Sequence, residues 1–198
     1  MSNAPVDSGR RRFLTWTTAV VGAVGAGFAA VPFISSWNPS AKAKIAGAPV
    51  KVDISKLESG QLILVKWRGK PVWVVNRTAD VLTKLGNHND ELRDPQSVEP
   101  QQPPYAQNAT RSIKPEILVA VGICTHLGCS PTYRKGDFAE LVQGLDFGFF
   151  CPCHGSTYDM AGRVFKGVPA PLNLVVPPHY YVNDNTILVG LSEEEAKA

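Results

Sequence analysis

The 198-residue sequence predicts an all-β head domain that is carried on a single N-terminal transmembrane helix. Two patterns indicate this fold class. No charged residue lies between Phe13 and Ala41, and residues 16–36 are almost wholly apolar or small. From Val50 onward, short apolar runs alternate with turn residues, which is typical of β-strands. A chain of this length has room for one domain of about 100–200 residues and a segment outside it.

The apolar segment is long enough to cross a membrane. The 21 residues from Trp16 to Ser36 would rise about 31 Å as a helix, and the hydrocarbon core of a bilayer is about 30 Å thick. Trp16 and Trp37 lie at the two ends, where tryptophan anchors membrane helices at the interface. An Ala-x-Ala sequence at residues 41–43 resembles a cleavage site, but the apolar segment is long for a signal peptide. We therefore expect an uncleaved anchor over residues 16–37.

Basic residues precede the anchor. Arg10 and Arg11 are followed by a variable position and then by Phe13 and Leu14, a pattern that resembles the twin-arginine export signal. The same arginines could instead only hold the cytoplasmic end of the helix, by the positive-inside rule. Both interpretations predict a cytoplasmic N-terminus at residues 1–15 and an anchor in the inner membrane of a bacterium. The head would then lie in the periplasm, where disulfides persist.

The segment between anchor and head predicts a tether. Residues 38–49 are rich in Ala, Gly, Ser, Pro and Lys and have no hydrophobic face that could dock on a core. Such a composition favours a flexible linker. About ten extended residues would reach some 30 Å, and we expect residues 40–48 to act as a moving hinge.

The elements of the head follow from its apolar runs. We expect a hairpin between the runs at residues 61–67 and 71–76, with Gly69 in its turn. The segment Thr78–Gly86 has a capping threonine, apolar residues at helical spacing and a terminal glycine, which predict a short helix. The polar stretch Asn87–Ser112 carries four prolines and is expected to be a long surface excursion. The remaining strands are expected at residues 50–54, 116–123, 146–150, 172–176 and 186–190.

All four cysteines and two of the four histidines lie in two short motifs, CTHLGC at residues 124–129 and CPCHGSTY at residues 151–158. Each motif follows an expected strand. A Cys-x-His in the first and a Cys-x-x-His in the second provide two thiolates and two imidazoles, which suit a transition metal. Cys129 and Cys153 are left without a metal role, and in an exported domain a disulfide between them is the economical interpretation.

At every fixed position these motifs match those of the Rieske iron–sulfur proteins, and the chain resembles that family. The resemblance implies a [2Fe–2S] cluster in which one iron is bound by Cys124 and Cys151 and the other by His126 and His154. Because neutral imidazoles replace two anionic thiolates, the negative charge around such a cluster is lower. Its potential is therefore roughly −150 to +300 mV, against about −400 mV for all-cysteine ferredoxins.

The resemblance also implies the Cys129–Cys153 disulfide. It further implies that Ser156 and Tyr158 donate hydrogen bonds to the cluster or to cysteine sulfur, which stabilises the reduced state and indicates the high-potential branch of the family. Without the motif around them, both side chains would be interpreted as turn-capping and packing residues.

For the fold, the resemblance implies an antiparallel β-sandwich at residues 50–190 with a small cluster-binding subdomain at about residues 119–172. Residues 191–198 would be a C-terminal tail. Gly167–Pro171 resembles the proline loop that covers the cluster in this family, with Val168 as an insertion. Leu127 would shield the cluster and contact a partner, although an apolar residue there could also be simple filling.

Other interpretations of the donor set remain to be weighed. Two cysteines and two histidines can form a structural zinc site, which the export signal, the spare cysteines and the Ser/Tyr pair argue against. An oxygenase of the Rieske type would need a second iron site on a large additional domain. The histidines left for it are His88 and His179, which have no ligand spacing and are expected to be ordinary surface residues.

Anchor, tether and motif set together resemble the iron–sulfur subunits of bacterial cytochrome bc1 complexes, which are ubiquinol–cytochrome c reductases. The resemblance implies that His154, with His126 as second candidate, meets ubiquinol at cytochrome b. An electron and a proton would be accepted there, and the electron would pass to the haem of cytochrome c1, contributing to a proton gradient. It also implies a dimeric complex, with lipid around the anchor. The plastoquinol-oxidising cytochrome b6f subunit is the alternative.

Composition excludes one further class of partner. The net charge of +3 is mild, and the basic residues are scattered along the sequence. Nucleic-acid binding needs a concentrated basic surface, so we expect no nucleic-acid partner.

Overall fold

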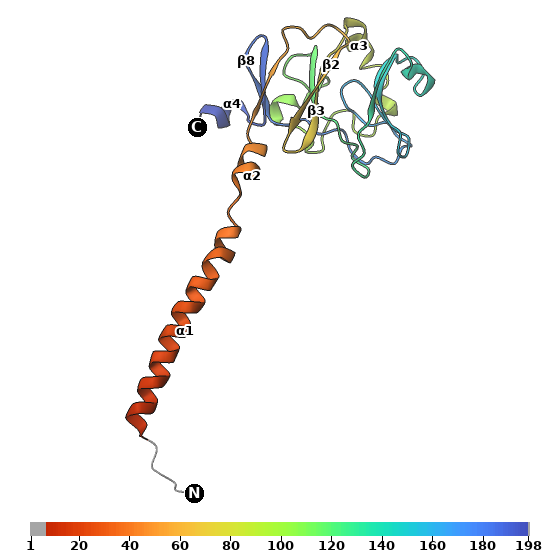
Figure 1. Ribbon diagram of the computed structural model, residues 1–198. Helices are drawn as coiled ribbons and strands as arrows, with labels where there is room; N and C mark the ends of the chain where they lie inside the picture. The colour runs from red at the N-terminus through yellow and green to blue at the C-terminus, as the bar shows by residue number, and fades with distance from the viewer. Residues whose placement is uncertain (1–6, 198) are drawn as a thin grey trace. The chain divides into compact units, whose positions relative to one another are not determined.

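The computed structural model describes residues 7–197 (Figure 1). The chain divides into two compact units, an N-terminal helical segment that ends at Ile45 and a folded domain that begins at Ala46. Each unit is described by itself below. The division agrees with the contrast in the sequence between a charge-free apolar stretch and alternating short apolar runs.

The N-terminal unit is built on one long helix, α1, which spans Ser8–Ser36. Asp7 caps it, because its carboxylate accepts hydrogen bonds from the backbone N–H groups of Gly9 and Arg10 at 2.9 and 3.1 Å. None of its residues is buried. The helix is long and apolar enough to cross a membrane. A six-residue helix, α2 (Ala41–Ala46), follows in the segment predicted as a tether, and the flexibility of that segment stays a prediction.

The folded domain is mostly β-structure, which confirms the predicted fold class. Its described residues form three antiparallel sheets of three strands, in the orders β1–β9–β8, β2–β3–β4 and β5–β6–β7. Short helical segments occur at α3 (Ala79–Lys84), α4 (Glu193–Lys197), η1 (Asn89–Glu91), η2 (Pro104–Ala106) and η3 (Phe138–Glu140). The strands are β1 (Val50–Asp53), β2 (Leu62–Trp67), β3 (Lys70–Asn76), β4 (Ile117–Val121), β5 (Thr132–Lys135), β6 (Phe147–Cys151), β7 (Ser156–Tyr158), β8 (His179–Asn183) and β9 (Thr186–Val189).

The sheet β2–β3–β4 lies between the other two, and its strands β3 and β4 are buried on both faces. Along β3, Val72 and Val74 pack toward the sheet β1–β9–β8, and the core they form there is called the far-side core. Trp73 and Val75 point the opposite way and pack with residues of the sheet β5–β6–β7 and with the cysteines, in a core called the cysteine-side core. Burial on two faces explains why β3 and β4 are continuous apolar runs rather than alternating ones.

The predicted hairpin and short helix are confirmed. The β2–β3 turn consists of Arg68 and Gly69, with φ of 49° and 76°. Two consecutive left-handed residues are typical of the type I′ turn, whose twist matches that of the strands. Helix α3 begins where Thr78 caps it, through a 3.2 Å hydrogen bond from the N–H of Val81 to the threonine hydroxyl.

The structure differs from the expected strands at three places in the chain. Residues 172–176 form no strand, because their backbone groups bond singly to separate segments: the N–H of Leu174 donates to Gly162, and the carbonyl of Val175 accepts from Val121. Strands β5 and β8 were not expected, since their sequences mix polar and apolar residues.

The excursion Asn87–Ser112 is not confined to the surface, because Leu92 and Arg111 within it are buried. His179 is buried as well rather than a surface residue. Its ring Nδ1 lies 2.8 Å from the carbonyl oxygen of Pro177. His88 is half-buried beside Glu91.

Candidate metal centre

The two cysteine motifs fold into equivalent turns. The first follows β4, and the second is the connection between β6 and β7. In each, a glycine four residues after the leading cysteine has a left-handed backbone, with φ of 85° at Gly128 and 75° at Gly155. Its N–H donates to the carbonyl of that cysteine, at 3.1 Å to Cys124 and 2.9 Å to Cys151. A left-handed φ at this point favours glycine.

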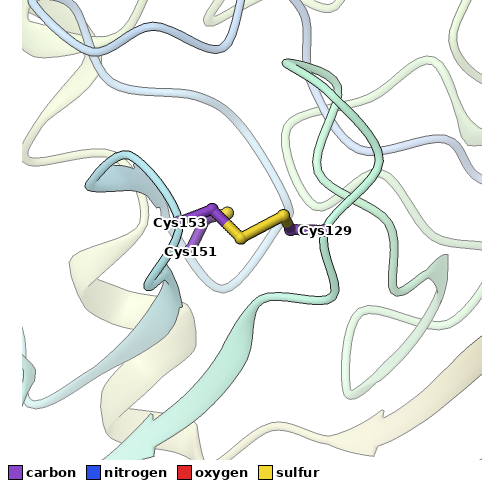
Figure 2. A group of neighbouring side chains, drawn as sticks. All are labelled: Cys129, Cys151 and Cys153. Carbon is purple, nitrogen blue, oxygen red and sulfur yellow. A yellow bond between two sulfur atoms is a disulfide. The ribbon is translucent and has the colours of Figure 1, made fainter.

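A disulfide joins the two turns, as the sequence predicted. The sulfur atoms of Cys129 and Cys153 are bonded, and their Cα atoms are 6.6 Å apart. Figure 2 shows this bridge beside Cys151, and the three sulfur atoms lie within 4.8 Å of one another. Disulfide sulfurs are not thiolates, so Cys151 is the one member of this group that can bind a metal through a thiolate.

The two remaining cysteines are free and buried side by side. Cys124 and Cys151 are 2% and 1% exposed, and both belong to the cysteine-side core. Burial by itself raises the pKa of the Cys124 thiol, but hydrogen bonds from Tyr158 and its other neighbours outweigh burial, and the pKa is lowered. Burial raises the pKa of Cys151.

Tyr158 and Ser156 are buried on β7. The Tyr158 hydroxyl donates to Cys124 Sγ at 3.2 Å, as expected of a donor to sulfur. The Ser156 hydroxyl accepts from the N–H of Ala170 at 3.1 Å, and its role as a donor to sulfur stays a prediction. Burial raises the pKa of Tyr158, which keeps its hydroxyl protonated and able to donate.

The two histidines lie on the solvent side of the sulfurs. The rings of His126 and His154 are edge to face, with centroids 4.7 Å apart. His154 is exposed, and Leu127 beside the rings is 72% exposed. Nδ1 of His126 is buried without a hydrogen-bond partner in the described part of the chain. A buried polar atom of this kind is costly unless a further group satisfies it.

These observations test whether the residues fit a [2Fe–2S] cluster. Two free thiols lie together inside the domain, and two imidazoles lie together at its surface. The unpartnered Nδ1 of His126 offers a lone pair where a metal ligand is needed. Two sulfur and two nitrogen donors form the mixed set of Rieske centres. The residues fit the group.

The third loop, Gly167–Pro171, is held against both motifs. The N–H of Ala170 donates to the Ser156 hydroxyl at 3.1 Å. The Thr125 hydroxyl donates to the carbonyl of Leu172 at 2.6 Å and lies 3.3 Å from the Tyr158 hydroxyl. Sequence reasoning missed the role of Thr125. Its position between Cys124 and His126 is the signal that could have found it.

Two family models match the sequence. One, described as the Rieske [2Fe-2S] domain, matches residues 50–178, and the other, described as "Ubiquitinol-cytochrome C reductase Fe-S subunit TAT signal", matches residues 1–40. The second match agrees with the interpretation of Arg10 and Arg11 as part of a twin-arginine signal.

Curated proteins are similar over nearly the whole chain. The ubiquinol-cytochrome c reductase iron-sulfur subunit of Allochromatium vinosum is 62% identical over 192 residues, which covers 96% of this chain and 92% of that protein. The subunit of the same name from Rhodospirillum rubrum is 46% identical over 186 residues, with 93% of each covered. A chain of a solved structure named "Hyperthermophilic respiratory Complex III" is 25% identical, has a TM-score of 0.47, and covers 87% of this chain and 98% of that one.

Proposed function

Because this chain belongs to the Rieske iron–sulfur subunits of ubiquinol–cytochrome c reductase, we propose that its head takes one electron and one proton from ubiquinol at cytochrome b. It then passes the electron to the haem of cytochrome c1, and so contributes to a proton gradient. Family membership makes the chain an electron-transfer subunit of this oxidoreductase, with one [2Fe–2S] cluster, a twin-arginine signal and an N-terminal helix that fits a membrane anchor.

The ligand assignment is part of the proposal. Cys124 and Cys151 bind one iron from the buried side, and His126 and His154 bind the other from the surface. When bound, the cluster supplies a one-electron acceptor of relatively high potential. The pair Cys129–Cys153 keeps the two turns together, and Ser156 and Tyr158 donate hydrogen bonds to sulfur. Their buried positions beside Cys124 support this division of roles.

The exposure of His154 beside Leu127 is the observation that carries the proposed reaction. An imidazole at the surface can accept a hydrogen bond from a quinol hydroxyl and then hold its proton. Leu127, 72% exposed, gives the apolar ring of the quinol and the surface of cytochrome b a contact next to that imidazole. His126, half-buried, is the second candidate for the same contact.

The arrangement along the chain supports delivery to two partners. We place residues 1–15 in the cytoplasm, the anchor at 16–37 in the bacterial inner membrane of a dimeric complex, and the Rieske domain at 50–190 in the periplasm. A tether at 38–49 lets the head reach cytochrome b and cytochrome c1 in turn. Replacing residues 40–48 with a proline run should slow turnover while the cluster still assembles, and unchanged turnover would contradict the moving hinge.

The substitution Leu127→Arg tests the docking role at the surface. A charged side chain there would have to be buried without a partner against an apolar surface, which is costly. We expect quinol–cytochrome c reductase activity of the membranes to fall at least about tenfold, while the electron paramagnetic resonance (EPR) signal of the cluster keeps its intensity. Leu64→Arg is the matched control, because Leu64 is a 59% exposed leucine on β2. Equal activity of the two variants would refute the assignment of this surface.

A further inference from the structure

Three arginines are buried in the domain around a single carboxylate. Arg77, Arg111 and Arg163 are at most 2% exposed, and Asp159 is 3% exposed. These four residues are called the buried arginine cluster. No other acidic side chain in residues 7–197 is buried. Three positive charges therefore face one negative charge away from water.

Both carboxylate oxygens of Asp159 accept hydrogen bonds from its own turn and from Arg163. One carboxylate oxygen accepts from Arg163 Nε at 2.8 Å. The other accepts from the backbone N–H groups of Ala161 and Arg163, at 2.9 and 2.8 Å. Arg163 is thus neutralised by Asp159, and the pair closes the turn that follows β7.

Arg77 and Arg111 have no carboxylate partner among the described residues, and they bind carbonyls instead. Arg77 donates to Met160 at 3.1 Å, and Arg111 donates to Ala161 at 3.1 Å and Gly162 at 3.4 Å. Three consecutive carbonyls of one turn are therefore held by two guanidinium groups. Burial lowers the pKa of both arginines to about 10, so both are charged at neutral pH.

This turn packs in the same core as the free cysteines of the metal centre. It continues from Tyr158, whose hydroxyl donates to Cys124 Sγ. Met160 and Ala161 belong to the cysteine-side core, which also contains Cys124 and Cys151. In a buried region the effective dielectric is low and salt screens little, so a fixed charge acts over a longer distance than it does at the surface.

We propose that Arg77 and Arg111 are positioning residues whose buried charge, which no hydrogen-bonded carboxylate neutralises, raises the reduction potential of the cluster bound by Cys124 and Cys151. Reduction adds one negative charge to that cluster, and nearby buried positive charge favours it. The same guanidinium groups hold the turn from which Tyr158 reaches the sulfur. The proposal rests on the ligand assignment given under the proposed function.

The test compares substitutions of opposite charge in the full chain, assembled in membranes and titrated by EPR. Arg111→Gln removes a positive charge, so its midpoint should fall, by about tenfold in the reduction equilibrium constant, or 59 mV for a one-electron couple. Asp159→Asn removes the negative charge, so its midpoint should rise. Loosening of the turn alone would move both midpoints in the same direction. Opposite signs therefore separate an electrostatic role from a structural one.

Two further variants serve as rescue and control. Arg111→Lys keeps the charge and should stay close to the wild-type midpoint. Arg134→Gln removes an equal charge from β5, where Arg134 is 27% exposed and pairs with Asp137 at 2.7 Å, and should leave the midpoint unchanged. Midpoints that shift together, or an Arg111→Lys shift as large as that of Arg111→Gln, would overturn the proposal.

Failure to assemble the cluster is also informative. If Arg111→Gln fails to load the cluster, Arg77→Gln replaces it, and its midpoint should fall in the same way. If Arg111→Lys fails as well, Arg111 has a folding role and the proposal is overturned. Absence of the EPR signal in the wild-type membranes would contradict the proposed function itself, which is a distinct result.

Discussion

The two faces of the middle sheet border cores of different chemistry. The far-side core is built from aliphatic side chains such as Val74 and Ile187, with Trp67 at its margin. The cysteine-side core contains two thiols and the phenol of Tyr158, and the buried arginine cluster adjoins it. One strand, β3, thus supplies a purely apolar core on one face and the support of a reactive site on the other. Stability and function are divided between the faces of one sheet.

The largest expected effect is on the cysteine side. Cys151→Ala should abolish the EPR signal of the cluster and iron binding, because the proposed ligand set loses one of its two thiolates. Cys153→Ala, two residues away, removes a disulfide sulfur and no ligand. It should retain iron and acid-labile sulfide in freshly prepared membranes. Equal loss of iron in both variants would show that the two cysteines do not differ in role.

Removing the disulfide should have the next largest effect. In the double variant Cys129→Ala/Cys153→Ala, the free energy of unfolding is expected to fall by about 2–4 kcal/mol, because the unfolded chain gains conformational freedom. Thermal unfolding of the detergent-solubilised chain measures this. Val74→Ala, in the far-side core, should also reduce stability but leave the midpoint potential unchanged. A change in the midpoint potential of the cluster in Val74→Ala would contradict the division of roles between the two cores.

A smaller effect is expected at Tyr158. Tyr158→Phe removes the hydrogen bond to Cys124 Sγ, and a hydrogen bond to a charged group contributes about 1.5 kcal/mol or more. Since this bond stabilises the reduced cluster more than the oxidised one, the midpoint should become more negative. Tyr133→Phe is the matched control, because that hydroxyl donates to the carbonyl of Gly60 at 3.1 Å. Its potential should equal that of the wild type.

The smallest expected effect concerns pH and the far side of the middle sheet. Burial lowers the pKa of His179, and its hydrogen bond to the carbonyl of Pro177 opposes this only in part. The neutral ring is therefore favoured in the folded state. The unfolded chain binds the extra proton as pH falls below about 6.5, so stability is complete above that pH and decreases below it.

His179→Gln should remove this dependence, which amounts to at most about 1.4 kcal/mol per pH unit. The measurement is the difference in free energy of unfolding between pH 7.5 and pH 5.5 for the two proteins. A wild type that is no more acid-sensitive than the variant would show that His179 is not kept neutral by the fold. The cluster potential at pH 7.5 should be the same in both.

Sequence patterns predicted the strands that carry apolar runs, whether their burial is uniform, as in β4, or alternating, as in β9. The runs that form β3 and β4 are buried on both faces, so their apolar character is continuous and easily recognised. Strand β5, with the sequence TYRK, has only half-buried or exposed residues and carries no such pattern. Residues 172–176 are apolar like a strand, but Asn173 is buried there and binds the N–H of Val164. An apolar pattern alone does not distinguish these isolated hydrogen bonds from the repeated hydrogen bonds between paired strands.

The candidate metal centre has stronger sequence signals than its surroundings. The spacing of cysteine and histidine is local, so the motif resemblance predicted the disulfide, which is present, and the roles of Ser156 and Tyr158, of which the hydrogen bond from Tyr158 to Cys124 is present. The buried arginines have no local signal, since Arg111 lies in a polar, proline-rich stretch and resembles a surface residue. Its burial depends on carbonyls some fifty residues away in the chain, at Ala161 and Gly162. An analysis of short sequence patterns cannot detect contacts between residues that far apart in the chain.

The central strand has a consequence for how the head comes apart. Val72 and Val74 belong to one core, and Trp73 and Val75 belong to the other. Unfolding of either core would therefore remove the packing partners from one face of β3. We therefore expect no partly unfolded state in which one core is intact and the other is lost. We expect visible absorbance of the cluster and far-ultraviolet circular dichroism to vanish over the same narrow temperature range, as a single cooperative event.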